Sequence, residues 1–380
     1  MYVIMFLYAV SNTFIGPLVT VFMEQYEISL SANGLIFFCQ GLGGIAFLII
    51  GVIFGDRLMK STWIILTFGT YGVLIILLSS ISAYYQLLII FFLVGGITRL
   101  LDAMLNANIA QIYREKRAFF LNILHACFGA GALIGPVLSS VFVSENIRMS
   151  NMFFGLGSLC ALAFAAFIYI NKRTSVISAE AESKTIAAVV KLIKNPNMVI
   201  MSISASLYVG YALGISAWFP TYMLQVMRTS VLFSGLIVSV FWAGIITGRV
   251  AHSFLSLRYN KRRLLIFGNL IGGTAYVSAA LLNVPIAYVF GLFVSAFFTS
   301  AGIPLMMAMA GELFPRQTGS ASSVIMLGGA IGLMLVPWII GIVAESVSYW
   351  VAILILGLLS YAASILAALL KTGKKTGARL

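Results

Sequence analysis

Long apolar runs separated by short polar segments dominate the chain. Each run is close to the length that a helix needs to cross the hydrocarbon core of a bilayer, about 20 residues. The runs lie at about residues 1–23, 31–54, 62–80, 84–112, 119–143, 150–171, 198–226, 230–248, 264–282, 286–310, 321–343 and 348–370. They are too long and too uniformly apolar for the alternating strands of a membrane barrel. The pattern predicts an all-α membrane protein with twelve transmembrane helices.

The composition agrees with a membrane protein. Of the 380 residues, 61% are hydrophobic and only 9% are charged, whereas a soluble domain carries roughly 25% charged residues. So small a charged fraction cannot cover a soluble surface, and the solvent for most of the chain must be lipid. The first run has neither a basic flank nor a small-residue cleavage site, so we expect a span rather than a removed signal peptide.

The positions of the basic residues predict the orientation. Twenty of the 23 lysines and arginines fall in the C-terminal tail or in alternate loops, with Arg249 counted in one of those loops. The other loops hold only Arg148 and Arg228. Basic loops mark the cytoplasmic side, so we expect a multi-pass protein of the plasma or inner cell membrane with both termini in the cytoplasm. This asymmetry accounts for the net charge of +13, and no nucleic acid partner is expected.

The longest segment between runs, residues 172–197, divides the runs into two sets of six. We expect an N-terminal bundle at 1–171, a cytoplasmic linker at 172–197, a C-terminal bundle at 198–370 and a basic tail at 371–380. In the linker, the apolar residues Ile186, Val189, Val190 and Ile193 are spaced as one face of a helix. Such a helix, with lysines off that face, lies on the membrane surface. A flexible linker is the alternative.

The two sets of six runs show a weak sequence similarity to each other. The fifth run contains "FGAGALIGPVLSSVFVSE" and the eleventh contains "LGGAIGLMLVPWIIGIVAES". Each begins rich in glycine, has one proline in the middle and ends near a glutamate. Repeated halves with a site between them are the usual architecture of secondary transporters. The chain is therefore predicted to form two pseudo-symmetric six-helix bundles.

Polar side chains in the fourth and fifth runs form a candidate site. Arg99 and Asp102 lie near the middle of the fourth run, where each charge costs roughly 2.5–3.5 kcal/mol, and their spacing puts them on one helix face. Asn106 and Asn122 extend this polar surface toward the cytoplasm, and His125 lies two turns into the fifth run from the same side. One interpretation is the wall of a water-accessible cavity, where Asp102 exchanges a proton beside Arg99, assisted by His125. The alternatives are a permanent Arg99–Asp102 ion pair and a neutral histidine in helix packing.

The loop after the second run resembles a signature of the major facilitator superfamily. "GVIFGDRLMKS" is similar to that superfamily's G-x-x-x-D-R-x-G-R-R pattern, with Asp56, Arg57 and Lys60 in matching positions. Val52 and Met59 stand where the pattern has glycines. The resemblance implies a gating role, in which these charges hold the cytoplasmic side shut through charge-assisted hydrogen bonds. Solvated loop charges are the alternative.

Three segments resemble the branch of fucose:proton symporters and their glucose-transporting relatives. "SNTFIGP" is similar to the first-helix pattern "LNDILIP", with Asn12 in place. "LLDAMLNA" is similar to the fourth-helix pattern "LETAANP", with Asp102 on the glutamate and Asn106 on the asparagine. "LNILHACFGAGALIGP" is similar to the fifth-helix pattern, with Asn122 and His125 placed.

Two carboxylates of that branch are missing. Thr13 stands where its first helix has an aspartate, and Ala212 stands where its seventh helix has a glutamate. Asp102 is the carboxylate that remains. The resemblance implies alternating access, a monosaccharide as the solute, and a proton or a sodium ion as the coupling ion.

A sugar site needs amides for the hydroxyl groups and aromatic faces for the ring. The predicted substrate-binding residues are Asn12, Gln40, Asn106, Asn122, Tyr211, Trp218 and Trp242. Tyrosine and tryptophan near span ends also serve as interface anchors, and helix packing can satisfy a buried amide. These structural roles are the alternatives.

No motif indicates catalysis. The three cysteines lie within apolar runs, and no CxxC pair, zinc-ligand spacing, serine elbow or Walker loop is present. We therefore expect no enzyme, no cofactor and no metal. The expected partners of a monomer are a small-molecule substrate, a proton or sodium ion and membrane lipids.

The sequence predicts a secondary active transporter that moves a small polar solute, a monosaccharide, by proton-coupled symport. One alternative is a drug:proton antiporter of the same superfamily, since 16 methionines and 28 phenylalanines suit an adaptable apolar pocket. Another is a membrane sensor or scaffold that has the same fold and transports nothing, as the missing carboxylates indicate.

Overall fold

The computed structural model describes residues 1–54, 59–113, 116–173, 192–315 and 317–370, which are almost entirely helical and contain no strand. The N-terminal part consists of α1 (Tyr2–Thr13), η1 (Gly16–Leu18), α2 (Val19–Tyr26), α3 (Leu30–Phe54), α4 (Lys60–Leu77), η2 (Leu78–Ser80), α5 (Tyr84–Ile112), α6 (Arg117–Ser144) and α7 (Met149–Arg173). The C-terminal part consists of α9 (Pro196–Gln225), α10 (Val231–Arg258), α11 (Lys261–Leu282), α12 (Pro285–Thr299), α13 (Gly302–Leu313), α14 (Thr318–Ser346) and α15 (Tyr349–Leu369).

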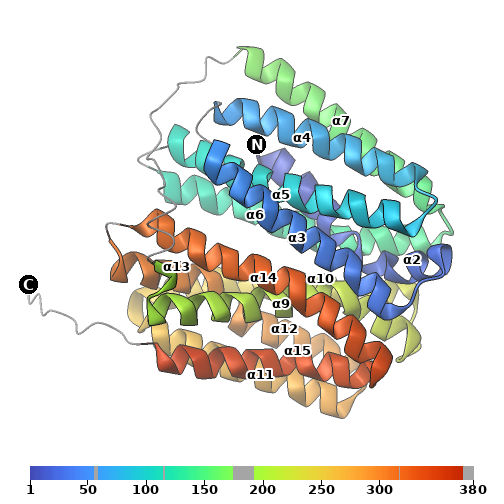
Figure 1. Ribbon diagram of the computed structural model, residues 1–380. Coiled ribbons are helices and arrows are strands. Elements are labelled where there is room, and N and C mark those ends of the chain that lie inside the picture. Colours follow the sequence, from blue (N-terminus) through green and yellow to red (C-terminus); the bar gives the residue numbers. More distant parts are fainter. Residues whose placement is uncertain (55–58, 114–115, 174–191, 316, 371–380) are drawn as a thin grey trace, which may run out of the picture.

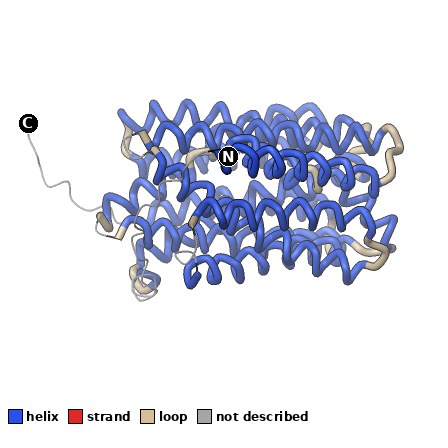
Figure 2. The backbone as a smooth tube through the Cα atoms, turned by 90° about the horizontal axis from the view of Figure 1, so that it is seen from above, coloured by secondary structure: helices blue, strands red, loops and turns tan. Residues whose placement is uncertain are grey.

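Twelve stretches of the described residues are long and apolar enough to cross a membrane, as predicted. The first combines α1, η1 and α2, the third combines α4 and η2, and the tenth combines α12 and α13. All of them run along a common direction (Figure 2). The chain is therefore a multi-pass membrane protein.

The helices form two bundles, with α1 to α7 in the upper half of Figure 1 and α9 to α15 in the lower half. Small residues let neighbouring helices approach closely in a membrane, where no hydrophobic force drives them together. In the N-terminal bundle, Gly95 of α5 lies against the backbone of Gln40 in α3. In the C-terminal bundle, Gly244 of α10 lies against the backbone of Phe293 in α12. A side chain at either glycine would force the helices apart.

The two ends of the bundles differ in charge. We call one end the basic end; there the helices meet the segments 54–60, 113–117, 173–196, 258–261 and 313–318. The other is the far end, with the connections 26–30, 80–84, 144–149, 225–231, 282–285 and 346–349. In the described residues, basic side chains at the basic end include Lys60, Lys116, Lys261, Arg262 and Arg263.

The bundles meet along a seam that runs from the middle of the spans to the far end. Gly41 of α3 lies against the backbone of Met334 in α14, and Gly34 lies against Trp338 further along. At the far end, the backbone N–H of Ser31 donates to Glu345 Oε2 at 2.8 Å. These α3–α14 contacts, together with those below, are the far-end seam.

Further contacts of the far-end seam join η1 to α9 and α6 to α10. Gly16 of η1 lies against the carbonyl of Ser216 in α9. Gly235 of α10 lies against the carbonyl of Pro136 in α6, and Ser239 Oγ donates to the carbonyl of Leu133 at 2.6 Å. In this conformation the bundles are thus held together over the far half of the membrane.

The first and tenth spans are broken, which the sequence analysis did not predict. Pro17 interrupts the first span because proline has no N–H for the helical ladder. In the tenth span, Pro304 has no N–H to donate to the Ser300 carbonyl. Helix α12 ends just before Ser300 and α13 begins just after it. The hydroxyl of Tyr208 in α9 donates to the freed Ser300 carbonyl at 3.3 Å. Tertiary hydrogen bonding therefore stabilises the break.

One predicted boundary is wrong. The eighth run was predicted to end at residue 248, but α10 continues to Arg258. Arg249 therefore lies inside a transmembrane helix rather than in a loop, because α10 is longer than the minimum that spans a bilayer. The predicted surface helix at residues 184–195 falls largely outside the described residues, and the tail at 371–380 falls entirely outside them.

Candidate functional site

Charged and polar side chains from both bundles lie at one depth in the membrane. Asp102 is ten residues before the end of α5, His125 is eight residues after the start of α6, and Arg249 is nine residues before the end of α10. All three therefore lie about the same distance from the basic end. We call the polar layer the set of these three residues together with their neighbours Tyr8, Arg99 and Asn106.

The helices α6 and α10 bring His125 and Arg249 toward each other across the two bundles. Gly129 of α6 lies against the side chain of Ile246 in α10. His125 is one turn from Gly129 toward the basic end, and Arg249 is one turn from Ile246 in the same direction. Both side chains thus lie on the faces of α6 and α10 that meet at Gly129 and Ile246. The charges of Arg249 and Asp102 act on the His125 imidazole.

His125 has exposed side-chain surface although it lies within a span. Its side chain is exposed, while the charges that act on it come from α5 and α10, on either side of the boundary between the bundles. These neighbours place His125 at the boundary between the bundles, on the basic-end side of the far-end seam.

The structure does not bring Arg99 and Asp102 into an ion pair. Among the described residues, neither side chain lies within salt-bridge distance of an opposite charge. Asp102 Oδ1 instead accepts a hydrogen bond from Asn106 Nδ2 at 2.9 Å, and the same amide donates to the Asp102 carbonyl at 2.8 Å. The stem of Arg99 packs over Gly44 of α3. The permanent ion pair that the sequence left open is thus absent here.

Asn12 and Gln40 form a second polar contact in the N-terminal bundle. Gln40 Nε2 donates to Asn12 Oδ1 at 3.1 Å. Gln40 is buried and Asn12 is half-buried. Each amide keeps part of its hydrogen-bonding capacity.

The three predicted aromatic residues occupy different places. Trp242 is buried between the bundles, where its indole N–H donates to Ser216 Oγ at 3.2 Å and its ring meets Phe128 edge-on at 5.8 Å. Trp218 lies in the far-end seam, fully buried, and donates to a carbonyl of α14 at 2.7 Å. Tyr211 lies in the core of the C-terminal bundle, hydrogen-bonded to Ser295 at 2.6 Å. Of these three, the structure brings Trp242 nearest to the α6–α10 boundary.

Part of the predicted gate can be placed. Lys60, at the start of α4, donates from Nζ to Gln111 Oε1 of α5 at 2.9 Å. Asp56 and Arg57 lie outside the described residues, and so does the side chain of Asn122. In the part of the chain that the structure describes, no three metal-ligating side chains come together.

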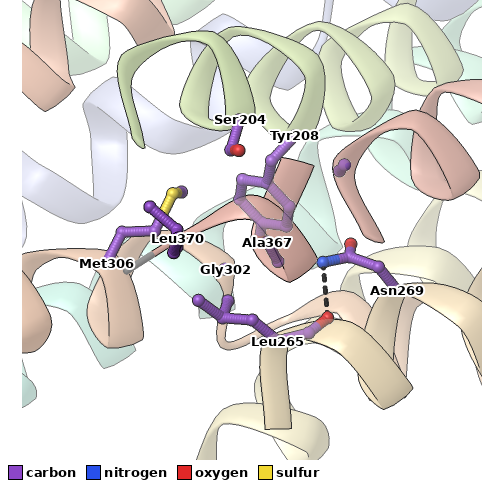
Figure 3. Close-up of a pocket in the computed structure, with 9 residues that line it drawn as sticks. Ser204, Tyr208, Leu265, Asn269, Gly302, Met306, Ala367 and Leu370 are labelled. Atoms are coloured by element: carbon purple, nitrogen blue, oxygen red, sulfur yellow. Dashed lines mark hydrogen bonds between the residues drawn. The ribbon is translucent and has the colours of Figure 1, made fainter. Parts of the chain in front are cut away.

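A small cavity lies in the C-terminal bundle beside the break in the tenth span (Figure 3). Its lining residues are Ser204, Tyr208, Leu265, Asn269, Gly302, Met306, Ala363, Ala367 and Leu370. The volume of about 10 Å³ has room for one water molecule. The Ser204 hydroxyl is buried and has no hydrogen-bond partner among the described residues. The cavity is too small for a metabolite and contains no residue of the polar layer.

Arg249 is the site residue that the sequence analysis missed. Its Nε is buried and has no hydrogen-bond partner in the described part of the chain. The signal was present, because apolar residues continue beyond it in "GIITGRVAHSFL" and no other charged residue follows before Arg258. Counting Arg249 with the basic loop that follows concealed it.

The chain resembles known proteins in sequence. The sequence profile of the Major Facilitator Superfamily matches residues 1–285 and 228–379. Protein TsgA homolog of Buchnera aphidicola subsp. Baizongia pistaciae is 24% identical over 307 residues, which cover 79% of this chain and 76% of that protein. The glucose/mannose transporter GlcP of Bacillus subtilis is 22% identical over 274 residues, covering 68% and 65% respectively.

Two solved structures share the fold. The nucleoside transporter NupG superposes with a TM-score of 0.78 at 12% identity, over 97% of this chain and 97% of that one. A single-residue variant of the fucose:proton symporter FucP of E. coli superposes with a TM-score of 0.67 at 16% identity, over 98% of each chain. At such low identity, these likenesses concern the fold alone.

Proposed function

The chain belongs to the major facilitator superfamily, and we propose that it is a secondary active transporter that carries a small polar solute in symport with a proton. The observation that carries this proposal is the polar layer, in which charges from both bundles lie deep in a membrane span. Intramembrane charges are costly and mark solute or proton pathways. A membrane sensor or scaffold would not need them at the boundary between two bundles.

The conformation supports alternating access. The bundles are joined along the far-end seam, while His125 remains exposed beyond it toward the basic end. We propose that the basic end is cytoplasmic, since basic loops face that side. The conformation would then be inward-facing, in the plasma or inner membrane, with the polar layer accessible from the cytoplasm.

Asp102 is the proposed proton carrier. Other carboxylates in the described spans, Glu24, Glu312 and Glu345, lie within two or three residues of a span end, whereas Asp102 lies deep in its span. Its hydrogen-bond donor Asn106 is a neutral amide, so no cation permanently neutralises the carboxylate. Alternation would change its distance from Arg99 and Arg249, and proton binding and release at Asp102 would follow that change.

A monosaccharide is the first solute to test. The amides of Asn12, Gln40 and Asn106 suit hydroxyl groups, and the Trp242 ring offers an apolar face. The similarity to a protein named as a glucose/mannose transporter adds weight to this choice.

The test is uptake of labelled hexoses into liposomes that contain the purified protein, under an imposed pH gradient. Asp102→Asn should abolish accumulation against a gradient but spare solute counterflow, because exchange needs no net proton movement. Glu145→Gln, an exposed loop change, is the matched control and should leave both intact. Accumulation by Asp102→Asn equal to that of the parent would refute the coupling role.

A further inference from the structure

The polar layer contains more positive than negative charge. Arg99 and Arg249 each contribute a guanidinium, and Asp102 is the one carboxylate among the described residues of the layer. The tyrosine, the asparagine and a neutral histidine add no charge. Within the described part of the chain, one cationic group of the layer is therefore left without a counter-ion.

Neither guanidinium is satisfied by the described protein. The Nε of Arg249 is buried and unpartnered, and neither arginine makes an ion pair with a described residue. The carboxylate of the layer, Asp102, accepts a hydrogen bond from Asn106 instead. A half-buried arginine within a span is expensive unless something else pairs with it.

The two arginines belong to different bundles. Arg99 and Asp102 belong to α5, and both act on Tyr8 of α1 in the N-terminal bundle. Arg249 belongs to α10 of the C-terminal bundle and acts on His125. An anion between the two arginines would thus touch both bundles. Contact with both is what a solute needs in order to influence their relative movement.

We propose that the transported solute carries an anionic group, a carboxylate or a phosphate, which binds Arg249 and is shared with Arg99. Guanidinium groups recognise both of these anions by paired, charge-assisted hydrogen bonds. Combined with the amides of Asn12 and Asn106, the site fits a hydroxylated acid, such as a sugar acid or a sugar phosphate. This inference rests on the proposed function and narrows its solute class.

An anionic solute changes the charge that is moved. A monoanion carried with one proton crosses without net charge, whereas a neutral sugar carried with one proton moves one positive charge. Transport of the monoanion would therefore respond to a pH gradient and not to membrane potential. Transport of a neutral sugar would respond to both.

The test compares matched probes on the purified full chain. Glucose, glucuronate and glucose 6-phosphate share a ring and differ in charge, and binding is followed by ligand-induced thermal stabilisation. We expect at least one of the two anions to bind at least about tenfold more tightly than glucose. Arg249→Gln should abolish this preference and Arg249→Lys should retain part of it. Arg258→Gln, an exposed change at the end of the same helix, should leave it intact.

The outcomes separate the two proposals. If glucose binds as tightly as the anions and Arg249→Gln changes nothing, the anion inference is overturned while the transporter stands. The inference also fails if neither anion stabilises the protein. If the protein exchanges glucose but neither anion, and every arginine variant keeps this exchange, the proposed transport function stands and the anion inference is refuted. The melting temperature of each variant without probe identifies loss of folding, and the Lys variant tests the charge if the Gln variant is unstable.

Discussion

The contact between Gly41 and Met334 can be tested by adding one methyl group. The Cβ of an alanine at position 41 would lie 2.5 Å from Met334 Cα and Cβ and 2.8 Å from its backbone N. Carbon atoms in contact are normally about 3.5 Å apart. The helices α3 and α14 would have to separate by about 1 Å, the difference between these distances. Since backbone atoms are involved, no side-chain rotation can relieve the overlap.

The size of the effect follows from this overlap. Overpacking of this kind costs about 1–3 kcal/mol, and it applies only to the conformation in which the far-end seam is closed. Gly41→Ala should therefore shift the equilibrium toward conformations with an open far end, by roughly 5-fold to 150-fold. The far end would open without any change in the polar layer.

The assay measures the distance between two spin labels, one at the far end of each bundle. The labels are attached at Glu145→Cys and Val347→Cys in a protein whose native cysteines are replaced by serine. Gly41→Ala should increase the long-distance population. Gly155→Ala is the matched control, because nothing lies within 4 Å of a Cβ at that glycine, and it should leave the distribution as in the parent. A Gly41→Ala distribution identical to that of the parent would refute the reasoning that this contact holds the seam.

Two further predictions concern stability, measured as thermal unfolding of the purified protein. Tyr208→Phe removes the hydroxyl that donates to the Ser300 carbonyl at the break in the tenth span. It should lower the free energy of unfolding by about 0.6–1.7 kcal/mol. An unchanged melting temperature would mean that water replaces the hydroxyl. Glu312→Gln breaks the pair with Lys261, in which the side chains are 63% and 30% exposed. It should cost less than about 1 kcal/mol, and the cost should shrink further as salt is added, since exposed pairs contribute little and are screened; a larger loss would show that this pair belongs to a network.

The span pattern could be predicted because membrane helices must satisfy their own backbone and present apolar surface. Arg99, Asp102 and His125 were found for the same reason, since a charge or an imidazole is conspicuous in an apolar run. Arg249 is charged in the same way, but it is close to a basic loop, so it was assigned to that loop. A predicted span of minimum length was too short to include it.

Other features were not predictable from the sequence because they depend on which face a residue occupies. A membrane helix is apolar on its lipid face and on its packed face, so hydrophobicity does not tell them apart. Trp218 and Tyr211 therefore could not be assigned to the seam and to the bundle core beforehand. The helix breaks were missed for a related reason. Proline alone does not predict them, since Pro136, Pro220 and Pro337 lie inside continuous helices.

The two broken spans allow the two ends of the bundles to change shape separately. The short helix of the first span, α2, lies at the far end of the N-terminal bundle, and the short helix of the tenth span, α13, lies at the basic end of the C-terminal bundle. A bend at one of these breaks would narrow or widen the space between the bundles at that end, before the rest of either bundle had to rotate.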